Sequence, residues 1–176
     1  ERAIIGAMPT PQPGIFAQGS RRHRHLELDL HPDASDAEVT AAVAAVLDLF
    51  IHPGGINVVV GFGPALWGRL AADDDLPLDL DPFDVDGLPA TQHDLWLWLH
   101  GSDEGVLFDT ALAAAEHLAP VASLAAEVEG FVYRDSRDLI GFVDGTENPG
   151  MDEVVDVAVV PADHPGAGGS HVLVQR

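Results

Sequence analysis

Polar and apolar residues recur in a regular order along most of the chain. Residues 25–30 alternate in the way that a strand with one buried face requires. Ser-Asp-Ala-Glu at 35–38 is a capping-box sequence, which marks the start of a helix. Apolar residues then repeat at helical spacing, and the pattern predicts a helix over 36–50. The run 56–62 is almost entirely apolar and predicts a second strand, which is followed by a short helix that begins near Gly63-Pro64.

The following residues repeat the same order of elements. Residues 93–100 are apolar on both faces and predict a central strand that is covered on both sides. Residues 123–133 predict a further strand, and residues 104–118 predict a helix whose inward-facing residues are Val106, Leu107, Ala111, Leu112 and Ala115. The order predicts the α+β class: a ferredoxin-like (βαββαβ) antiparallel sheet with helices 36–50 and 104–118 on one face.

Composition indicates a folded protein and argues against some classes of partner. The chain has 176 residues, of which 47% are hydrophobic, and it contains no Cys, so disulfides are excluded. No apolar run is long enough for a transmembrane helix. The net charge is −21, which repels phosphate backbones and anionic lipid, so we expect neither a nucleic-acid nor a membrane partner. Attraction of cationic substrates and simple solubility both account for the charge, and solubility is the favoured interpretation.

Two polar clusters raise the question of a metal site. Residues 73–86 contain seven Asp, but their spacing differs from that of a calcium loop, and a solvated acidic loop is favoured over a cation site. His23 and His25 would project to the same side of a strand as Glu27. A His-x-His pair can bind metal, yet a solvated strand face is the favoured interpretation.

The most specific run is 137–149, Arg-Asp-Leu-Ile-Gly-Phe-Val-Asp-Gly-Thr-Glu-Asn-Pro. Within it Asp144 lies in a Gly-x-x-Asp-Gly pattern, between an apolar residue and a glycine. We expect this carboxylate to lie at a bend, partly shielded from water, where its environment can tune it as an acid or a base. A bare Gly-x-x-Asp-Gly is more often a simple turn, whereas the full run of thirteen residues is much more specific.

The run 137–149 resembles the signature of the dye-decolourising peroxidases, which are haem enzymes that use hydrogen peroxide. Residues 129–133 and 167–176 are similar to the strands that precede and follow the signature in this family. The resemblance implies haem b as cofactor, hydrogen peroxide and an organic reductant as substrates, and Asp144 as the catalytic acid and base. It also implies a set of residues close to the haem: Gly141, Phe142, Gly145, Thr146, Glu147 and Asn148. For Asn148 a simple turn with Pro149 stays equally open.

The resemblance covers the N-terminal half of such an enzyme. In the family a proximal His binds the haem iron and a distal Arg works beside the Asp, and both follow the strand that ends here at Arg176. We therefore expect no metal ligand in this chain and place the proximal His beyond Arg176. His164 and His171 do not match the proximal position. The chain alone is expected to bind haem weakly or not at all and to be inactive.

The same resemblance suggests three units and several partners. Residues 1–135 would form an N-terminal ferredoxin-like domain, 136–150 a loop on the distal side of the haem, and 151–176 a connector with the first strand of a second, truncated ferredoxin-like half.

The missing C-terminal half, a homo-oligomer and an enclosing shell are the expected macromolecular partners. A cytoplasmic location is favoured and export stays open. Two alternatives remain: haem binding or iron release without peroxidase turnover, and an isolated ferredoxin-like association module.

Overall fold

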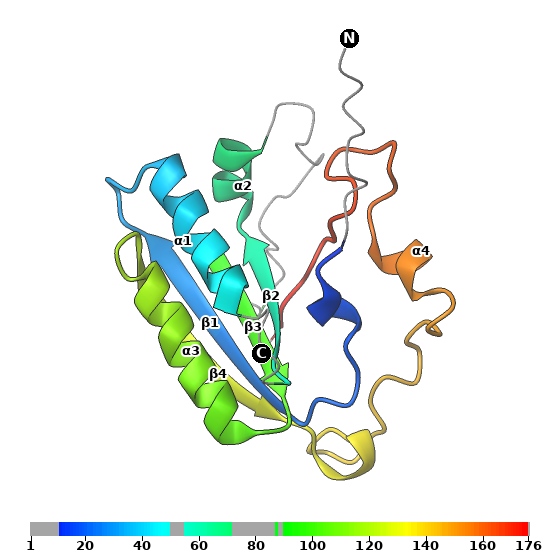
Figure 1. Ribbon diagram of the computed structural model, residues 1–176. Helices are drawn as coiled ribbons and strands as arrows, with labels where there is room; N and C mark the ends of the chain where they lie inside the picture. Colours follow the sequence, from blue (N-terminus) through cyan, green and yellow to red (C-terminus); the bar gives the residue numbers. More distant parts are fainter. Residues whose placement is uncertain (1–10, 50–54, 72–86, 88–89, 176) are drawn as a thin grey trace.

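Four strands form one antiparallel sheet in the computed structural model, which describes residues 11–49, 55–71, 87 and 90–175. The strands are β1 (Arg22–Leu30), β2 (Asn57–Phe62), β3 (Leu95–Gly101) and β4 (Ala122–Phe131), in the spatial order β2-β3-β1-β4. Helices α1 (Asp36–Asp48) and α3 (Glu104–Leu118) lie on the same face of this sheet (Figure 1). The predicted ferredoxin-like architecture is confirmed, including the central place of β3.

Local signals set the ends of both helices. Ser35 accepts a hydrogen bond from the backbone of Glu38, and the Glu38 carboxylate accepts one from the backbone of Ser35, so the predicted capping box is present. Asp103 caps α3 by accepting from the backbone N–H of Val106. A shorter helix, α2 (Pro64–Leu70), follows β2 as expected.

The core lies between the sheet and the two helices. On β3, Leu95, Leu97 and Leu99 are each 0% exposed, because alternate residues of a strand point to the same face. The inward stripe of α3 consists of Leu107, Ala111, Ala114 and Leu118.

The prediction was wrong for two residues of α3. Val106 is 37% exposed and Leu112 is 51% exposed. The buried stripe recurs every three or four residues from Leu107, and both residues lie beside this stripe and outside the contact with the sheet.

The opposite face of the sheet carries the alternate residues of the same strands. Partner positions across β1 and β3 bring His23 and His25 beside Trp98 and His100. His23 and His25 are partly buried, and Glu27 is only 7% exposed. The expectation of a solvated strand face was therefore wrong, because the bulky tryptophans of β3 fill the space above the strand.

An arm of residues 12–20 also lies against this second face. It contains the short 3-10 helix η1 (Pro13–Phe16), which contacts β2 and is the dark blue turn in Figure 1. The Gln12 side chain binds β2 as a backbone strand would, because its amide donates to the Val60 carbonyl and accepts from the Val60 N–H, both at 2.8 Å. A side chain at Gly14 would collide with the backbone of Val58, so the close approach requires glycine.

The segment after β4 has little regular structure. It contains the 3-10 turn η4 (Arg134–Ser136) and a single short helix, α4 (Val154–Ala158), within the described residues. The strand expected near 170–175 is not formed, since a strand needs a hydrogen-bonded neighbour and no described residue pairs with this segment. The acidic residues 73–86 lie outside the described residues. No helix in the described part of the chain is long and apolar enough to cross a membrane.

Candidate functional site

The motif loop, residues 137–149, is shaped by hydrogen bonds among its own residues. Asp138 Oδ1 accepts from the backbone N–H groups of Ile140 and Phe142, each at 3.0 Å. The Asp138 N–H in turn donates to the Phe142 carbonyl at 2.9 Å. These contacts fold the stretch before Asp144 into a compact turn without the help of a buried side chain.

Asp144 lies at a bend, as expected, and its backbone is fixed. Its N–H donates to the Ser136 carbonyl at 2.7 Å, and its Oδ1 accepts from the Gly145 N–H at 2.9 Å. The second oxygen, Oδ2, makes no hydrogen bond to any described residue. The side chain is exposed, so the expected shielding from water is not found: no described residue packs over this part of the loop.

Two glycines make the bends on either side of Asp144. Gly141 has φ of 104° and Gly145 has φ of 75°, a region that L side chains rarely adopt. A Cβ at Gly145 would also lie 3.1 Å from the amide nitrogen of Asn148. The glycines of the Gly-x-x-Asp-Gly pattern therefore have a conformational cause that is independent of any ligand.

The remaining residues of the predicted site share the loop with Asp144. Phe142 is 71% exposed, and Thr146, Glu147 and Asn148 are exposed as well. The Asn148 N–H donates to the Gly145 carbonyl at 3.2 Å, which closes a turn. The structure thus brings all seven predicted residues onto one short segment, and their proximity to haem stays a prediction.

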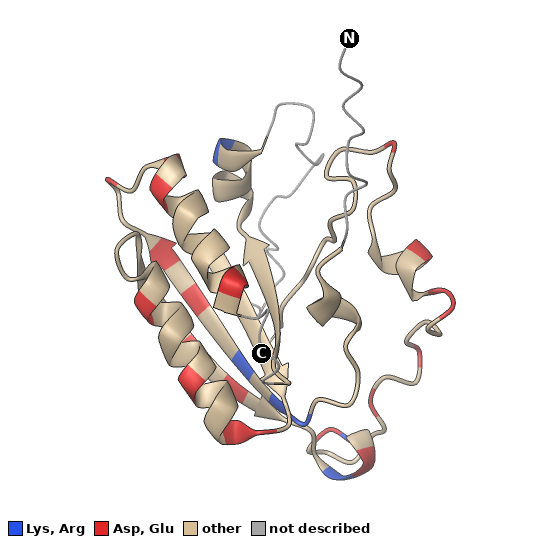
Figure 2. Cartoon of the chain, in the orientation of Figure 1, with Lys and Arg blue, Asp and Glu red and all other residues tan. Residues whose placement is uncertain are grey.

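The two arginines next to the motif have other contacts. Arg137 Nη1 donates to the Gly141 carbonyl at 2.8 Å, and Arg134 lies over the ring of Tyr133, 5.4 Å from its centroid. Neither arginine forms an ion pair with Asp144 among the described residues. Figure 2 shows basic and acidic residues close together in the turn after β4. Arg137 therefore supports the loop and does not supply a cation beside the Asp144 carboxylate.

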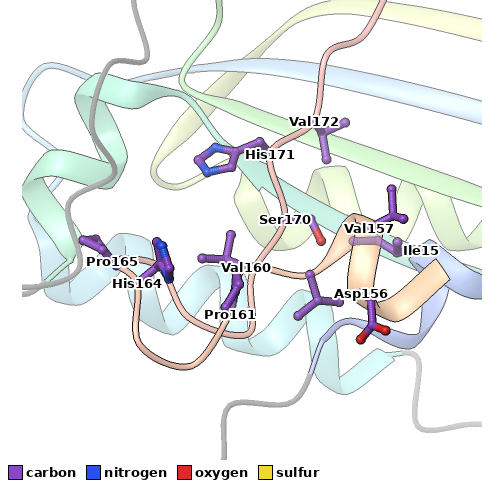
Figure 3. Close-up of a pocket in the computed structure, with 12 residues that line it drawn as sticks. Ile15, Asp156, Val157, Val160, Pro161, His164, Pro165, Ser170, His171 and Val172 are labelled. Carbon is purple, nitrogen blue, oxygen red and sulfur yellow. The ribbon is translucent and has the colours of Figure 1, made fainter. Parts of the chain in front are cut away.

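An open cavity of about 520 Å³ lies between η1 and residues 156–172 (Figure 3). Half of its lining residues are Val or Pro, and His164 and His171 also line it. His164 Nδ1 lies 2.8 Å from Asp163 Oδ1, and this hydrogen bond lowers the pKa of the Asp163 carboxyl below its ordinary range. No residue of the motif loop lines the cavity, so it is not the site that the motif predicts.

One cluster was not anticipated from the sequence. His23, Trp98 and His100 form a stacked cluster on the second face of the sheet, with ring centroids 5.9 Å apart for His23 and Trp98, 5.8 Å for His23 and His100, and 4.1 Å for Trp98 and His100. The signal was present as His at alternate positions of β1 and Trp-Leu-Trp-Leu-His on β3. No group of three potential ligands within the described residues is arranged to hold a metal ion.

Known proteins resemble this chain over most of its length. Residues 12–132 match the family described as "Dyp-type peroxidase, N-terminal", and residues 135–176 match "Dyp-type peroxidase, C-terminal". A dye-decolorizing peroxidase of Rhodococcus erythropolis is 40% identical over 132 residues, which are 72% of this chain and 38% of that protein.

Two solved structures share the fold. A variant of DypB from Rhodococcus jostii RHA1 in complex with heme is 30% identical, has a TM-score of 0.73, and matches 90% of this chain and 55% of its own. The encapsulated DyP-type peroxidase of Mycobacterium smegmatis is 28% identical, with a TM-score of 0.72, over 88% of this chain and 52% of its own. The chain thus spans between a third and just over half of these relatives. By its sequence and its fold, the chain belongs to the Dyp-type peroxidase family.

Proposed function

We propose that the complete protein is a haem-dependent peroxidase that uses hydrogen peroxide to oxidise dyes or other organic reductants. The observation that carries the proposal is the Asp144 carboxylate, fixed through Oδ1 and open at Oδ2, on the family's signature loop. A positioned carboxylate of this kind can take up a proton and return it.

The motif loop fits one side of a haem. Leu139, Ile140 and Phe142 are 74%, 81% and 71% exposed, so the loop presents apolar surface that a flat porphyrin would cover. Gly141 and Gly145 permit the backbone to approach a ring closely. A DypB structure in this family is in complex with heme, which supports haem b as the group. The loop contains no His, and we propose that the iron ligand comes from the C-terminal half.

Asp144 would handle the proton during peroxide cleavage. Bound haem supplies the redox chemistry of the reaction. Because the Gly145 N–H holds Oδ1, Oδ2 is the oxygen positioned to accept a proton from one peroxide oxygen and to return it to the other. Thr146, Glu147 and Asn148 would hydrogen bond to the haem edge, and Phe142 would exclude water from its face.

Larger assemblies follow from the same proposal. We propose that the C-terminal half covers the motif loop. We also propose that the complete protein forms a homo-oligomer or lies inside an enclosing shell in the cytoplasm. The encapsulated relative from Mycobacterium smegmatis supports the shell. Size-exclusion chromatography with light scattering on the complete protein, with and without co-expressed shell protein, distinguishes a free oligomer from an enclosed one.

The test of function uses Asp144→Asn in the complete protein. Asn keeps the size and can still accept from the Gly145 N–H, but it cannot accept the proton. Loss of a positioned acid and base typically slows a reaction by about 10²–10⁴-fold. Stopped-flow measurement of peroxide consumption should show such a loss while the haem content, read from the Soret band, stays unchanged.

Asp138→Asn provides a matched control on the same loop. Its amide oxygen can still accept from the Ile140 and Phe142 N–H groups, so this variant removes a charge but keeps the loop and the proton acceptor. It should retain nearly the parent rate. Equal losses in both variants, or none in Asp144→Asn, would remove Asp144 from the mechanism. Haem binding by the parent without peroxide consumption would favour haem transport or iron release.

A further inference from the structure

The arm of residues 12–20 is fastened to the second face of the sheet through a buried histidine. His100 is 0% exposed, and its Nε2 lies 3.0 Å from the Gly14 carbonyl oxygen, while its Nδ1 lies 2.7 Å from Ser20 Oγ. His100 therefore contacts the arm near both of its ends. The Gln12 side chain attaches the arm to Val60 of β2, and Gln18 Nε2 lies 3.0 Å from Met151 Sδ in the segment after the motif loop.

The hydrogen bonds define the protonation state of His100. A carbonyl oxygen only accepts, so Nε2 must carry a hydrogen. The Ser20 hydroxyl can then donate to an unprotonated Nδ1, which gives a neutral ring. A second proton would place a full charge in a position without access to water, which is costly unless a carboxylate compensates it.

The ring of His23, next to His100, also disfavours a second proton, and the reason is geometric. The indole N–H of Trp98 donates to His23 Nδ1 at 3.1 Å, and an indole nitrogen cannot accept. Protonation of that nitrogen would turn two donors toward each other. The His23 ring also stacks on His100, with centroids 5.8 Å apart, so two imidazolium rings would repel at close range.

The surroundings do not compensate such charges. On the same face β1 adds His25 and Glu27, but Glu27 Oε2 already lies 3.3 Å from Nε2 of His93. The neutral residues opposite these histidines come from β2 and β4, and the arm contains no charged residue between 11 and 20. Asp29, at the next position of β1 on the same face, lies 2.8 Å from Nδ1 of His93, and Asp156, His164 and His171 line the cavity beside Ile15 of the arm.

The pKa shifts of the two histidines set the direction in which pH acts on the arm. Burial lowers the pKa of His23 below its ordinary value of 6.5, although a hydrogen bond to the Ser20 backbone partly opposes this. Burial lowers the pKa of His100 as well; the hydrogen bond to the Gly14 carbonyl partly opposes this, and the neighbouring His23 and His25 add to the lowering. Groups with a lowered pKa bind more protons in an open state, so their contribution is complete above pH 6.5 and is lost as the pH falls below it.

We propose that His23 and His100 form a pH-sensitive latch that keeps the arm of residues 12–20 on the sheet at neutral pH and releases it in mild acid. Release would uncover Trp98 and its stacked neighbours while the helices and the sheet stay folded. The leucine core between the sheet and the helices contains neither histidine, which separates opening of the arm from unfolding.

The arm can be labelled at one position because the chain has no Cys. Gln18→Cys places a thiol on an exposed position of the arm, and an aminonaphthalene label there accepts energy from the three tryptophans. Energy transfer should be high at about pH 7.5 and fall by about pH 5.5, an interval that brackets the ordinary titration of His. Far-UV circular dichroism should be unchanged over the same interval. Loss of both signals together would mean global unfolding and would overturn the latch.

Three variants test which histidines cause the pH response. His23→Gln and His100→Gln retain hydrogen-bonding groups but do not titrate, and each should reduce the pH response strongly. His117→Gln on α3, on the other side of the sheet, should leave it unchanged. A full response in both latch variants would contradict the proposal. If these variants do not fold, NMR titration of the His ring protons in the parent decides, because titration of His23 and His100 at or above pH 6.5 would refute the latch.

Discussion

Two regions of this molecule use similar apolar residues in opposite ways. On β3 in the sheet, Leu95, Leu97 and Leu99 are each 0% exposed, whereas Leu139, Ile140 and Phe142 on the motif loop are 74%, 81% and 71% exposed. The sheet with its helices completes its own core. The loop that carries the candidate chemistry presents apolar surface that only a further group can cover. The packed core and the candidate site are thus located in separate parts of the chain.

The two regions also differ in what maintains their shape. The core is maintained by close packing, in which each side chain depends on its neighbours. The motif loop is maintained by two glycines with positive φ and by backbone hydrogen bonds to Asp138. A loop built in this way can keep its shape before a cofactor binds, which favours a site that is arranged in advance. Substitutions in the two regions should therefore have different effects on the same chain.

The largest effect is expected in the core. Leu97→Ala should lower the free energy of unfolding by about 2–5 kcal/mol, because it leaves a cavity under both helices at a central strand. Urea denaturation followed by circular dichroism measures this loss. A change below about 1 kcal/mol would mean that the interior collapses around the shorter side chain and is less specifically packed than the structure indicates.

Gly141→Ala should act on the loop and not on the core. An L side chain in the left-handed region costs roughly 1–2 kcal/mol, and the exposed loop can relieve this strain by opening locally. Backbone NMR shifts of residues 138–144 should move, while the urea midpoint of the chain stays nearly constant. A midpoint shift as large as that of Leu97→Ala would show that loop and core unfold as one unit.

Phe142→Ala should have a smaller effect still. The ring is 71% exposed, and surface substitutions of this kind usually change stability by less than about 0.5 kcal/mol. The same substitution in the complete protein should be clearly destabilising or reduce haem content, if haem or the C-terminal half covers the ring. Comparable small effects in both proteins would mean that nothing covers Phe142.

Haemin should have the smallest effect on the chain alone. The motif loop has no His to bind iron and provides one apolar surface without an opposing wall. Titration of haemin into the 176-residue chain should give neither a sharp Soret shift at one equivalent nor a higher melting temperature. Saturable binding at low micromolar haemin would show that the loop and its surroundings hold the porphyrin without a second half.

The sequence by itself determined the elements and the family. Alternation in 25–30, the capping box at Ser35 and the run 137–149 are local features, and hydrophobic period, caps and turn residues act over a few positions. They were sufficient for the ferredoxin-like order of strands and helices. They also place the residues around Asp144 on one loop, because these residues are neighbours in the chain, while their role in a site stays a prediction.

Only the tertiary structure decided which surfaces are covered. The rotation of α3 leaves Val106 and Leu112 outside the core, since packing and not periodicity alone fixes how a helix lies on a sheet. The pairing of β1 with β3 brings His23 into one stacked cluster with Trp98 and His100, which lie 75 or more residues further along the chain. The exposure of Asp144 was likewise decided by which segments pack over the loop, and burial depends on contacts between distant parts of the chain that no local pattern specifies.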